Sequence, residues 1–243
     1  MVKTAVILAA GLGSRLKDRT TNMPKGFITI GNKSLIEHSV SKLLKAGIEK
    51  ILIGTGHASN YYDLFAQNFP RTISCIRNER YRETGSMYTL YNMKEYIDAD
   101  FLLLESDLLY DQAGLTVLQE IKDPDVILAS GKTNSKDEVF IEADSKGNLI
   151  KMSKDSKELE NIFGELVGIT KISHSTFHKM CRFAEERLVD KPKLDYEYAL
   201  VGITISTSIF VKKIEDYIWC EIDDEAHLRR AEQEIFPRIK EQL

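Results

Sequence analysis

The chain has 243 residues, of which 43% are hydrophobic and 29% charged, and its formal net charge is −4. This length is sufficient for one large α/β domain or two small ones, and the weakly acidic balance excludes a strongly basic nucleic-acid-binding surface. Cys75, Cys181 and Cys220 fit no metal or disulfide pattern, and no signal peptide or apolar run of roughly 18 residues is seen, so we expect a cytoplasmic protein that neither spans nor binds a membrane.

Short apolar runs alternate along the chain with segments that carry apolar residues at helical spacing. Ser34 and Glu37 predict a capping box at the first helix, which ends at Gly47, and Ser86 is the expected N-cap of a later helix. In chain order the expected elements are strand 4–10, helix 34–47, strand 50–56, helix 60–69, strand 72–78, helix 86–97, strand 101–107, helix 114–122, strand 125–131, hairpin 138–154, strand 164–173, helices 174–188 and 196–212, strand 217–223 and helix 225–243.

Apolar strands that alternate with helices are typical of an α/β fold, here a Rossmann-like, mostly parallel sheet with helices on both faces. We found no internal repeat and no flexible linker, so residues 1–243 are expected to form a single domain. The segment 132–200 contains the predicted hairpin, and we expect it to include a small lid or acceptor-binding insertion at the carboxyl edge of the sheet.

The first predicted strand leads into a glycine-rich loop, "LAAGLGSRLKDRTTNMPKGF", over residues 8–27. Gly11 and Gly13 suit a turn whose backbone N–H groups hold phosphate oxygens. A dinucleotide fingerprint needs a third glycine where Leu16 stands, and a P-loop needs a Gly-Lys-Ser/Thr ending that is absent. A plain strand–helix turn remains the alternative.

Two cations distinguish this loop from a plain turn. Arg15 follows Gly13 by two residues, and Lys25 follows Pro24 ten residues later. Guanidinium binds polyphosphate bidentately and lysine supplies a compact charge, so both are candidates for catalysis and phosphate binding. Lys17 and Arg19 are expected to be solvated surface cations.

The stretch "LAAGLGSRL…PKGF" resembles the signature L-A-A-G-x-G-[ST]-R-[LM]…P-K of the sugar-phosphate and alcohol-phosphate nucleotidyltransferases. The resemblance implies the nucleotide-diphospho-sugar transferase fold and a nucleoside triphosphate as substrate. It also implies that Lys25 stabilises the transition state at the α-phosphorus and that Arg15 assists. The residues expected to hold the triphosphate are Leu8, Ala9, Ala10, Gly11, Leu12, Gly13, Ser14, Arg15 and Lys25.

Acidic residues stand at two predicted strand ends. Asp107 ends one apolar strand, and Glu221 and Asp223 are two residues apart on another, so their side chains share a face. Carboxylates on one face repel each other unless a cation lies between them, and Mg²⁺ prefers such ligands together with phosphate oxygens. By resemblance Asp107 and Asp223 bind the catalytic Mg²⁺, with Glu221 as a further ligand. The alternative for Asp223 or Asp224 is a helix N-cap.

The segment "RNERYRETGSMYTLYN", residues 77–92, resembles the cytidylyltransferase branch of the family. The resemblance places Asn78, Thr84, Gly85 and Ser86 near the cytosine, the ribose or the acceptor, and Asp107 beside the nucleotide. Tyr81 and Tyr88 are candidates for the site, Tyr88 for the acceptor, with core aromatics on a helix as the alternative, and Tyr91 is expected in the core.

The acceptor is expected to be a small phosphonate or phosphate with an amine. Asp195 and Glu197, with Tyr196 and Tyr198 beside them, suit a primary ammonium, which donates hydrogen bonds that a trimethylammonium cannot donate. Lys132 is a candidate partner for the acceptor's phosphonate. The version "TGSMYTL" also resembles 2-aminoethylphosphonate cytidylyltransferases more closely than the choline enzymes.

The sequence therefore predicts transfer of CMP from CTP to 2-aminoethylphosphonate, with Mg²⁺ as cofactor and pyrophosphate as the second product. Phosphocholine cytidylyltransferase is the first alternative, a non-catalytic nucleotide-sensing domain the second, and sugar-1-phosphate nucleotidyltransferase the third. A homodimer is left open. His174 and His178 are four residues apart with no third ligand in sight, which favours a surface pair over a zinc site.

Overall fold

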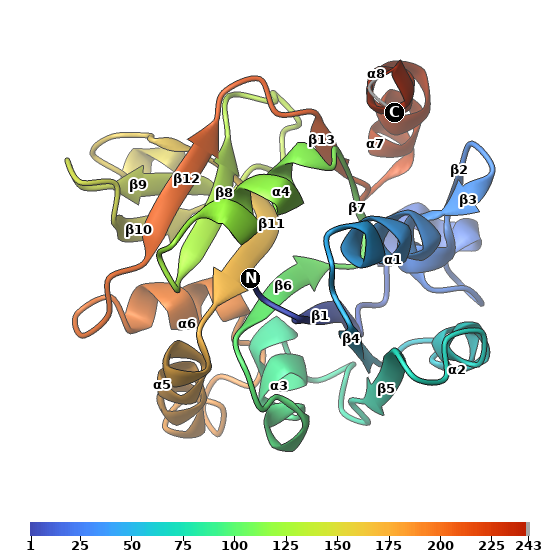
Figure 1. The fold of residues 1–243 in the computed structure, drawn as a ribbon, viewed down its shortest axis with the longest axis horizontal. Coiled ribbons are helices and arrows are strands. Elements are labelled where there is room, and N and C mark those ends of the chain that lie inside the picture. The colour runs from blue at the N-terminus through green and yellow to red at the C-terminus, as the bar shows by residue number, and fades with distance from the viewer. Residues whose placement is uncertain (242–243) are drawn as a thin grey trace.

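The computed structural model describes residues 1–241, without the side chains of residues 17, 18, 240 and 241. A twisted sheet runs through the molecule and helices cover both of its faces, as predicted (Figure 1). The expected solvation of the Lys17 side chain and the last two residues of the helix predicted at 225–243 lie outside the described part. Among the described residues, no helix has both the length and the apolar character that crossing a bilayer requires.

Four parallel strands form one half of the sheet, in the order β5-β4-β1-β6. They are β1 (Thr4–Ala9), β4 (Lys50–Thr55), β5 (Ile73–Arg77) and β6 (Phe101–Glu105). β11 (Gly164–Ile172) lies antiparallel to β6 and carries the sheet on to β8 (Val126–Ser130). Because parallel strands end at the same edge, the loops after β1, β4 and β6 converge there.

The hairpin predicted at 138–154 forms as β9 (Phe140–Ala143) and β10 (Leu149–Ser153). Its strand β9 pairs with the start of β11. The segment 132–200 thus includes both this hairpin and β11, which lies between β6 and β8 within the sheet.

Side chains that alternate along the strands pack into two apolar layers, one on each face of the sheet. On β1, Val6 and Leu8 face the layer beneath α3 (Ser86–Tyr91), α5 (His174–Glu185) and α6 (Tyr196–Gly202). Ala5 and Ile7 face the layer beneath α1 (Leu35–Lys45), α2 (Asn60–Ala66) and α4 (Ala113–Glu120). The predicted capping box of Ser34 and Glu37 is present at α1.

A third apolar cluster joins the C-terminal helices to the end of the molecule that carries the glycine-rich loop. Leu16 packs there with Leu228 of α7 (Glu225–Arg230), which continues through a π-helical turn at Ala231–Ile235 into α8 (Phe236–Glu241). Short 3₁₀ helices occupy Ser14–Arg19, Lys25–Phe27, Lys94–Tyr96 and Ser156–Glu158.

Several predicted elements need correction. The helix expected at 196–212 is wrong beyond Gly202, because residues 210–214 form strand β12 (Phe210–Ile214), parallel to β8. The run Ile209-Phe210-Val211 is β-branched and aromatic, which favours a strand. The strand expected at 217–223 is shortened to β13 (Trp219–Glu221), and the helix expected at 86–97 is α3 followed by a 3₁₀ turn.

Several short strands were not predicted from the sequence. β7 (Leu108–Tyr110) pairs antiparallel with β13 in a separate ribbon, and β2 (Thr29–Ile30) pairs with β3 (Lys33–Ser34). The expected N-cap role of Ser86 is also wrong, since Gly85 occupies that position. The backbone N–H of Ser86 instead donates to Asp195 Oδ1 at 3.2 Å, so a carboxylate from a distant segment caps α3.

Candidate active site

The glycine-rich loop turns immediately after β1. Gly13 has a φ of +64°, and a Cβ built there would lie 2.9 Å from Cγ of Lys25, so a side chain at this position would disturb the lysine. The carbonyl of Gly13 accepts hydrogen bonds from the backbone N–H of Leu16 at 3.0 Å and from the hydroxyl of Thr20 at 2.7 Å. These contacts fix the loop as a tight turn at the carboxyl edge of the sheet.

Lys25 lies at the centre of the site, and only 14% of its side chain is exposed. Its ammonium donates to Asp107 Oδ2 at 2.8 Å and also to Asp223 Oδ1. Burial lowers the pKa of Lys25, but the charges of Asp107 and Asp223 outweigh burial and raise the pKa above its usual value. Lys25 is therefore a fixed positive charge at neutral pH.

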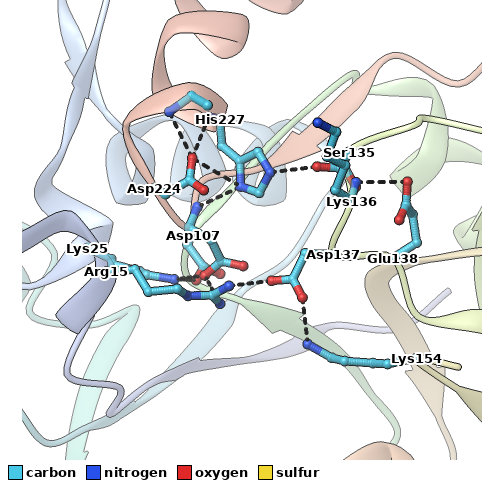
Figure 2. A network of polar contacts seen from close by, with 12 residues as sticks. Arg15, Lys25, Asp107, Ser135, Lys136, Asp137, Glu138, Lys154, Asp224 and His227 are labelled. Carbon is cyan, nitrogen blue, oxygen red and sulfur yellow. Dashed lines mark hydrogen bonds and ion pairs between the residues drawn. The ribbon is translucent and has the colours of Figure 1, made fainter.

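Arg15 contacts the same carboxylate oxygen of Asp223 as Lys25 does. One guanidinium nitrogen lies 2.8 Å from Asp223 Oδ1, and the other donates to Asp137 Oδ2 at 2.6 Å (Figure 2). The two catalytic candidates of the sequence thus lie side by side, as expected from their common loop. By contrast, Arg19 points to Glu225 outside this group, at 2.5 Å.

Four carboxylates gather around these two cations. Oxygens of Glu105, Asp107 and Glu221 lie within 4.8 Å of one another, and Asp223 joins them through Lys25. Burial raises the pKa of Glu105 to about 7 and that of Glu221 well above its usual value, and neighbouring carboxylates add to both shifts. Like charges at this spacing are stabilised by a divalent cation, and oxygen-only donors fit Mg²⁺.

Asp223 and the adjacent Asp224 have different roles. The side chain of Asp224 caps α7, accepting from the backbone N–H groups of Ala226 at 2.8 Å and His227 at 2.9 Å. Asp223 is buried and faces the cations, and its own backbone N–H donates to Nδ1 of His227 at 3.4 Å. The N-cap alternative therefore applies to Asp224 and leaves Asp223 for the site.

A cavity of about 1080 Å³, which we call the first cavity, opens beside the loop. Its polar wall contains Lys25, Asp107, Glu105 and Lys154. The predicted nucleotide-binding residues that line it are Leu8, Ala9, Ala10, Gly11, Gly13, Lys25, Thr84, Gly85, Ser86 and Asp107. Leu12 and Ser14 are exposed on the loop and do not line the cavity.

Asn78 does not line the first cavity and is buried behind it. Its amide nitrogen donates at 3.0 Å to the hydroxyls of Thr84 and Thr89, and its oxygen accepts from the backbone of Arg80 at 2.9 Å. Asn78 therefore holds the segment whose residues Thr84–Ser86 face the cavity.

A second cavity, of about 620 Å³, is lined by Glu105 and Glu221 of the carboxylate cluster. Glu105, Lys154 and Glu197 line both cavities, so the two spaces meet at these side chains. The second cavity also contains Trp219, Glu221 and Arg230 and is walled by residues 133–139.

Of the four predicted acceptor residues, two line the first cavity and two do not. Asp195 and Glu197 line the first cavity, and Oε2 of Glu197 is buried with no hydrogen-bond partner among the described residues. Burial raises the pKa of Glu197 to about 8, and the charge of Glu105 adds to the shift. Lys132 is exposed and Tyr88 lies beneath Arg80, and neither residue lines the first or the second cavity.

Several site residues were missed by the sequence reasoning. Glu105 lies two residues before Asp107, so the same-face argument used for Glu221 and Asp223 would have found it. The Tyr196 hydroxyl donates to Glu105 Oε1 at 2.7 Å. Asp137, Lys154 and His227 come from segments that carry no motif, and only the folded chain brings them to the site.

The chain is similar to several known cytidylyltransferases. It is 31% identical over 106 residues to choline-phosphate cytidylyltransferase of Streptococcus pneumoniae, covering 44% of this chain and 45% of that protein. It is 24% identical over 250 residues to CMP-5'-(3-aminopropyl)phosphonate synthase of Streptomyces rubellomurinus, covering 98% of this chain and 40% of that protein. The chain thus spans less than half the length of each of these two curated relatives.

The fold matches a solved structure throughout. The inositol-1-phosphate CTP transferase of T. maritima superimposes with a TM-score of 0.84 at 18% identity, covering 100% of this chain and 98% of that one. This agreement confirms the predicted nucleotide-diphospho-sugar transferase fold. Residues 4–152 match the model of the family described as nucleotidyl transferase. This match agrees with the glycine-rich loop and the Lys25–Asp107–Asp223 cluster. The chain therefore belongs to the nucleotidyl transferase family.

Proposed function

We propose that the protein is a cytidylyltransferase that transfers CMP from CTP to 2-aminoethylphosphonate and releases pyrophosphate. The observation that carries the proposal is the buried ammonium of Lys25, held between Asp107 and Asp223 at the edge of the first cavity. Such a fixed charge beside a glycine turn suits an α-phosphoryl group whose negative charge grows during transfer. The similarity to two cytidylyltransferases supports CTP as the nucleotide.

We further propose that the carboxylates hold Mg²⁺. Asp107, Asp223 and Glu221 are the proposed ligands, and Glu105 lies close enough to join them. Burial and neighbouring carboxylates raise the pKa values of Glu105 and Glu221, and a divalent ion would offset the repulsion among these groups. Bound Mg²⁺ would neutralise phosphate charge and so bring two anionic substrates together.

In the proposed reaction, an anionic phosphonate oxygen of the acceptor attacks the α-phosphorus of CTP. A new P–O bond forms to that oxygen, the bond to the β-phosphate bridging oxygen breaks, and pyrophosphate leaves with the electron pair. No proton has to be removed from the acceptor oxygen near neutral pH, so a general base is not required. Lys25 stabilises the charge at the α-phosphoryl group, while Arg15 binds the leaving phosphates.

The acceptor's amine is proposed to bind Glu197. This carboxylate lies where the two cavities meet, and its buried Oε2 has no partner among residues 1–241. A primary ammonium donates three hydrogen bonds and would supply both the missing partner and the missing charge. The carboxylate of Asp195 lies nearby, held by the backbone and hydroxyl of Ser86.

Phosphocholine is the second candidate acceptor, favoured by the similarity to the streptococcal choline-phosphate enzyme. A trimethylammonium group binds best against several aromatic faces. Trp219 lines the second cavity, but Tyr198 is 58% exposed and the hydroxyl of Tyr196 binds Glu105. This wall suits a hydrogen-bonding amine better than a quaternary one.

A panel of acceptors with Mg²⁺ and CTP tests the proposal by the rate of pyrophosphate release. The panel contains 2-aminoethylphosphonate, phosphocholine, phosphoethanolamine and glycerol phosphate. The highest kcat/KM is expected for 2-aminoethylphosphonate. A preference for phosphocholine would overturn the proposed acceptor, and nucleotide binding without pyrophosphate release from any acceptor would favour a nucleotide-sensing domain.

A further inference from the structure

Residues 131–139, which we call the strap, link β8 to the hairpin and form one wall of the second cavity. Thr133, Ser135, Asp137, Glu138 and Val139 all line that cavity. Two non-glycine residues of the strap, Asn134 and Lys136, have positive φ values of 55° and 77°. Backbone of this kind is held by its surroundings rather than by its own preference.

The strap is fastened to α7 and to β11. The Thr133 carbonyl accepts from Arg230 at 3.1 Å, and the Ser135 carbonyl lies 3.0 Å from Nε2 of His227. The backbone N–H and hydroxyl of Thr133 donate to Glu165 at 2.8 and 2.7 Å. Nδ1 of the same histidine ring accepts from the backbone of Asp223, which joins the strap to the catalytic centre.

At its other end, the strap is held by one cation of the glycine-rich loop and one cation that lines the first cavity. The carboxylate of Asp137 bridges Arg15 at 2.6 Å and Lys154 at 3.1 Å (Figure 2). Arg15 belongs to the glycine-rich loop, and Lys154 lines both cavities. Asp137 thus pairs with one cation of the loop that is proposed to hold the triphosphate and with one cation of the first cavity.

We propose that Asp137 takes the place of the triphosphate on Arg15 and Lys154, and that triphosphate binding releases the strap and opens the second cavity. A triphosphate carries more charge than one carboxylate and binds guanidinium bidentately, so it competes effectively for both cations. Once Asp137 is displaced, its charge is repelled by the phosphates and the strained strap loses one of its fastenings. This inference rests on the proposed nucleotide-binding function.

Ordered binding follows from this arrangement. Glu197, the proposed partner of the acceptor's amine, lines both cavities, so opening of the second cavity on nucleotide binding would strengthen acceptor binding and CTP would bind first. By linkage, the acceptor strengthens CTP binding by the same factor. Removing the Asp137 carboxylate should therefore weaken the coupling between the two substrates.

The test is hydrogen exchange of the backbone amides of residues 131–139, with and without inorganic tripolyphosphate or CTP. Wild-type protein is expected to exchange faster at Thr133 and Lys136 when either ligand is bound. Asp137→Asn should exchange fast without ligand and bind tripolyphosphate about two- to fivefold more tightly, the range of a partly exposed ion pair. Glu160→Gln removes an exposed carboxylate from the same region as a control and should behave as wild type.

Each outcome separates this inference from the function on which it rests. Tripolyphosphate or CTP binding that leaves exchange of the strap unchanged, or slows it, would overturn the inference and leave the proposed function intact. Equal affinity of Asp137→Asn and wild type for tripolyphosphate would also overturn it. Failure of the wild-type protein to bind CTP and tripolyphosphate would instead contradict the proposed function itself.

Discussion

The ammonium of Lys25 lies 2.8 Å from the carboxylate of Asp107, although 82 residues separate them in the sequence. The contact joins the glycine-rich loop after β1 to the end of β6, two neighbouring parallel strands. It places a buried cation among carboxylates at the edge where open α/β sheets bind ligands.

Lys25→Ala is expected to lower kcat by about 100- to 1000-fold, because one fixed charge that stabilises the transition state is removed. CTP binding should change much less, since the backbone of the loop stays in place. Stopped-flow measurement of pyrophosphate release gives kcat, and isothermal titration gives the CTP affinity. Lys33→Ala, at an exposed lysine of β3, is the control, and near-normal turnover of Lys25→Ala would contradict the assigned role.

Asp223→Asn and Asp224→Asn form a matched pair of adjacent substitutions. Asp223→Asn should reduce turnover by at least about 100-fold and raise the Mg²⁺ concentration needed for half-maximal activity. Asp224→Asn should retain activity and stability, because asparagine caps a helix as well as aspartate. A Mg²⁺ titration of both variants measures the difference. Equal dependence on Mg²⁺ in the two variants would exclude Asp223 as a metal ligand.

Glu197→Gln is expected to raise the acceptor KM by about 10-fold or more, because a hydrogen bond to a charged group is lost. The KM for CTP should remain within about twofold, since the proposed contacts of CTP are with the glycine-rich loop and Lys25 rather than with Glu197. Steady-state kinetics with each substrate varied in turn separates the effects. A rise in the KM for CTP alone would move Glu197 out of the proposed acceptor site.

The stability of the free protein should fall as pH rises from about 5 to about 8. Burial raises the pKa of Glu105 to about 7 and of Glu197 to about 8, whereas an unfolded glutamate titrates near about 4.3. Between these values the folded chain binds more protons than the unfolded chain, so the free energy of unfolding decreases with pH, by on the order of 1 kcal/mol per pH unit.

Urea unfolding in EDTA at several pH values measures this slope. Glu197→Gln should flatten it, because one of the carboxyls with a raised pKa no longer titrates. A stability that rises with pH through this window would show that these carboxyls are not held in their protonated forms.

Much of the fold was predictable because its strands are continuous apolar runs and its helices carry periodic apolar faces. The capping box at Ser34 and Glu37 is a local pattern and was read correctly. The short strands β7 and β12 were not predicted, since β7 gains its register from β13, more than a hundred residues away, and β12 from β8. Strands of this kind are specified by tertiary pairing rather than by local propensity.

In the candidate site, too, residues in local motifs were predictable, whereas residues that depend on tertiary contacts were not. Lys25, Arg15, Asp107 and Asp223 were identified from motifs, and the structure brings all four together. Asp137 was not identified, because its role depends on which cations a loop meets after folding. Ser86 was assigned to its own helix cap, whereas the cap comes from Asp195, 109 residues away.

Phosphorus-31 NMR of CTP, Mg²⁺ and 2-aminoethylphosphonate with the enzyme detects the proposed transfer itself. The phosphonate resonance is expected to shift to a new, coupled signal of a mixed anhydride, while pyrophosphate appears in equal amount. With Lys25→Ala the same spectrum should stay unchanged over the same time. Unaltered phosphonate and CTP resonances with the wild-type enzyme would contradict the account.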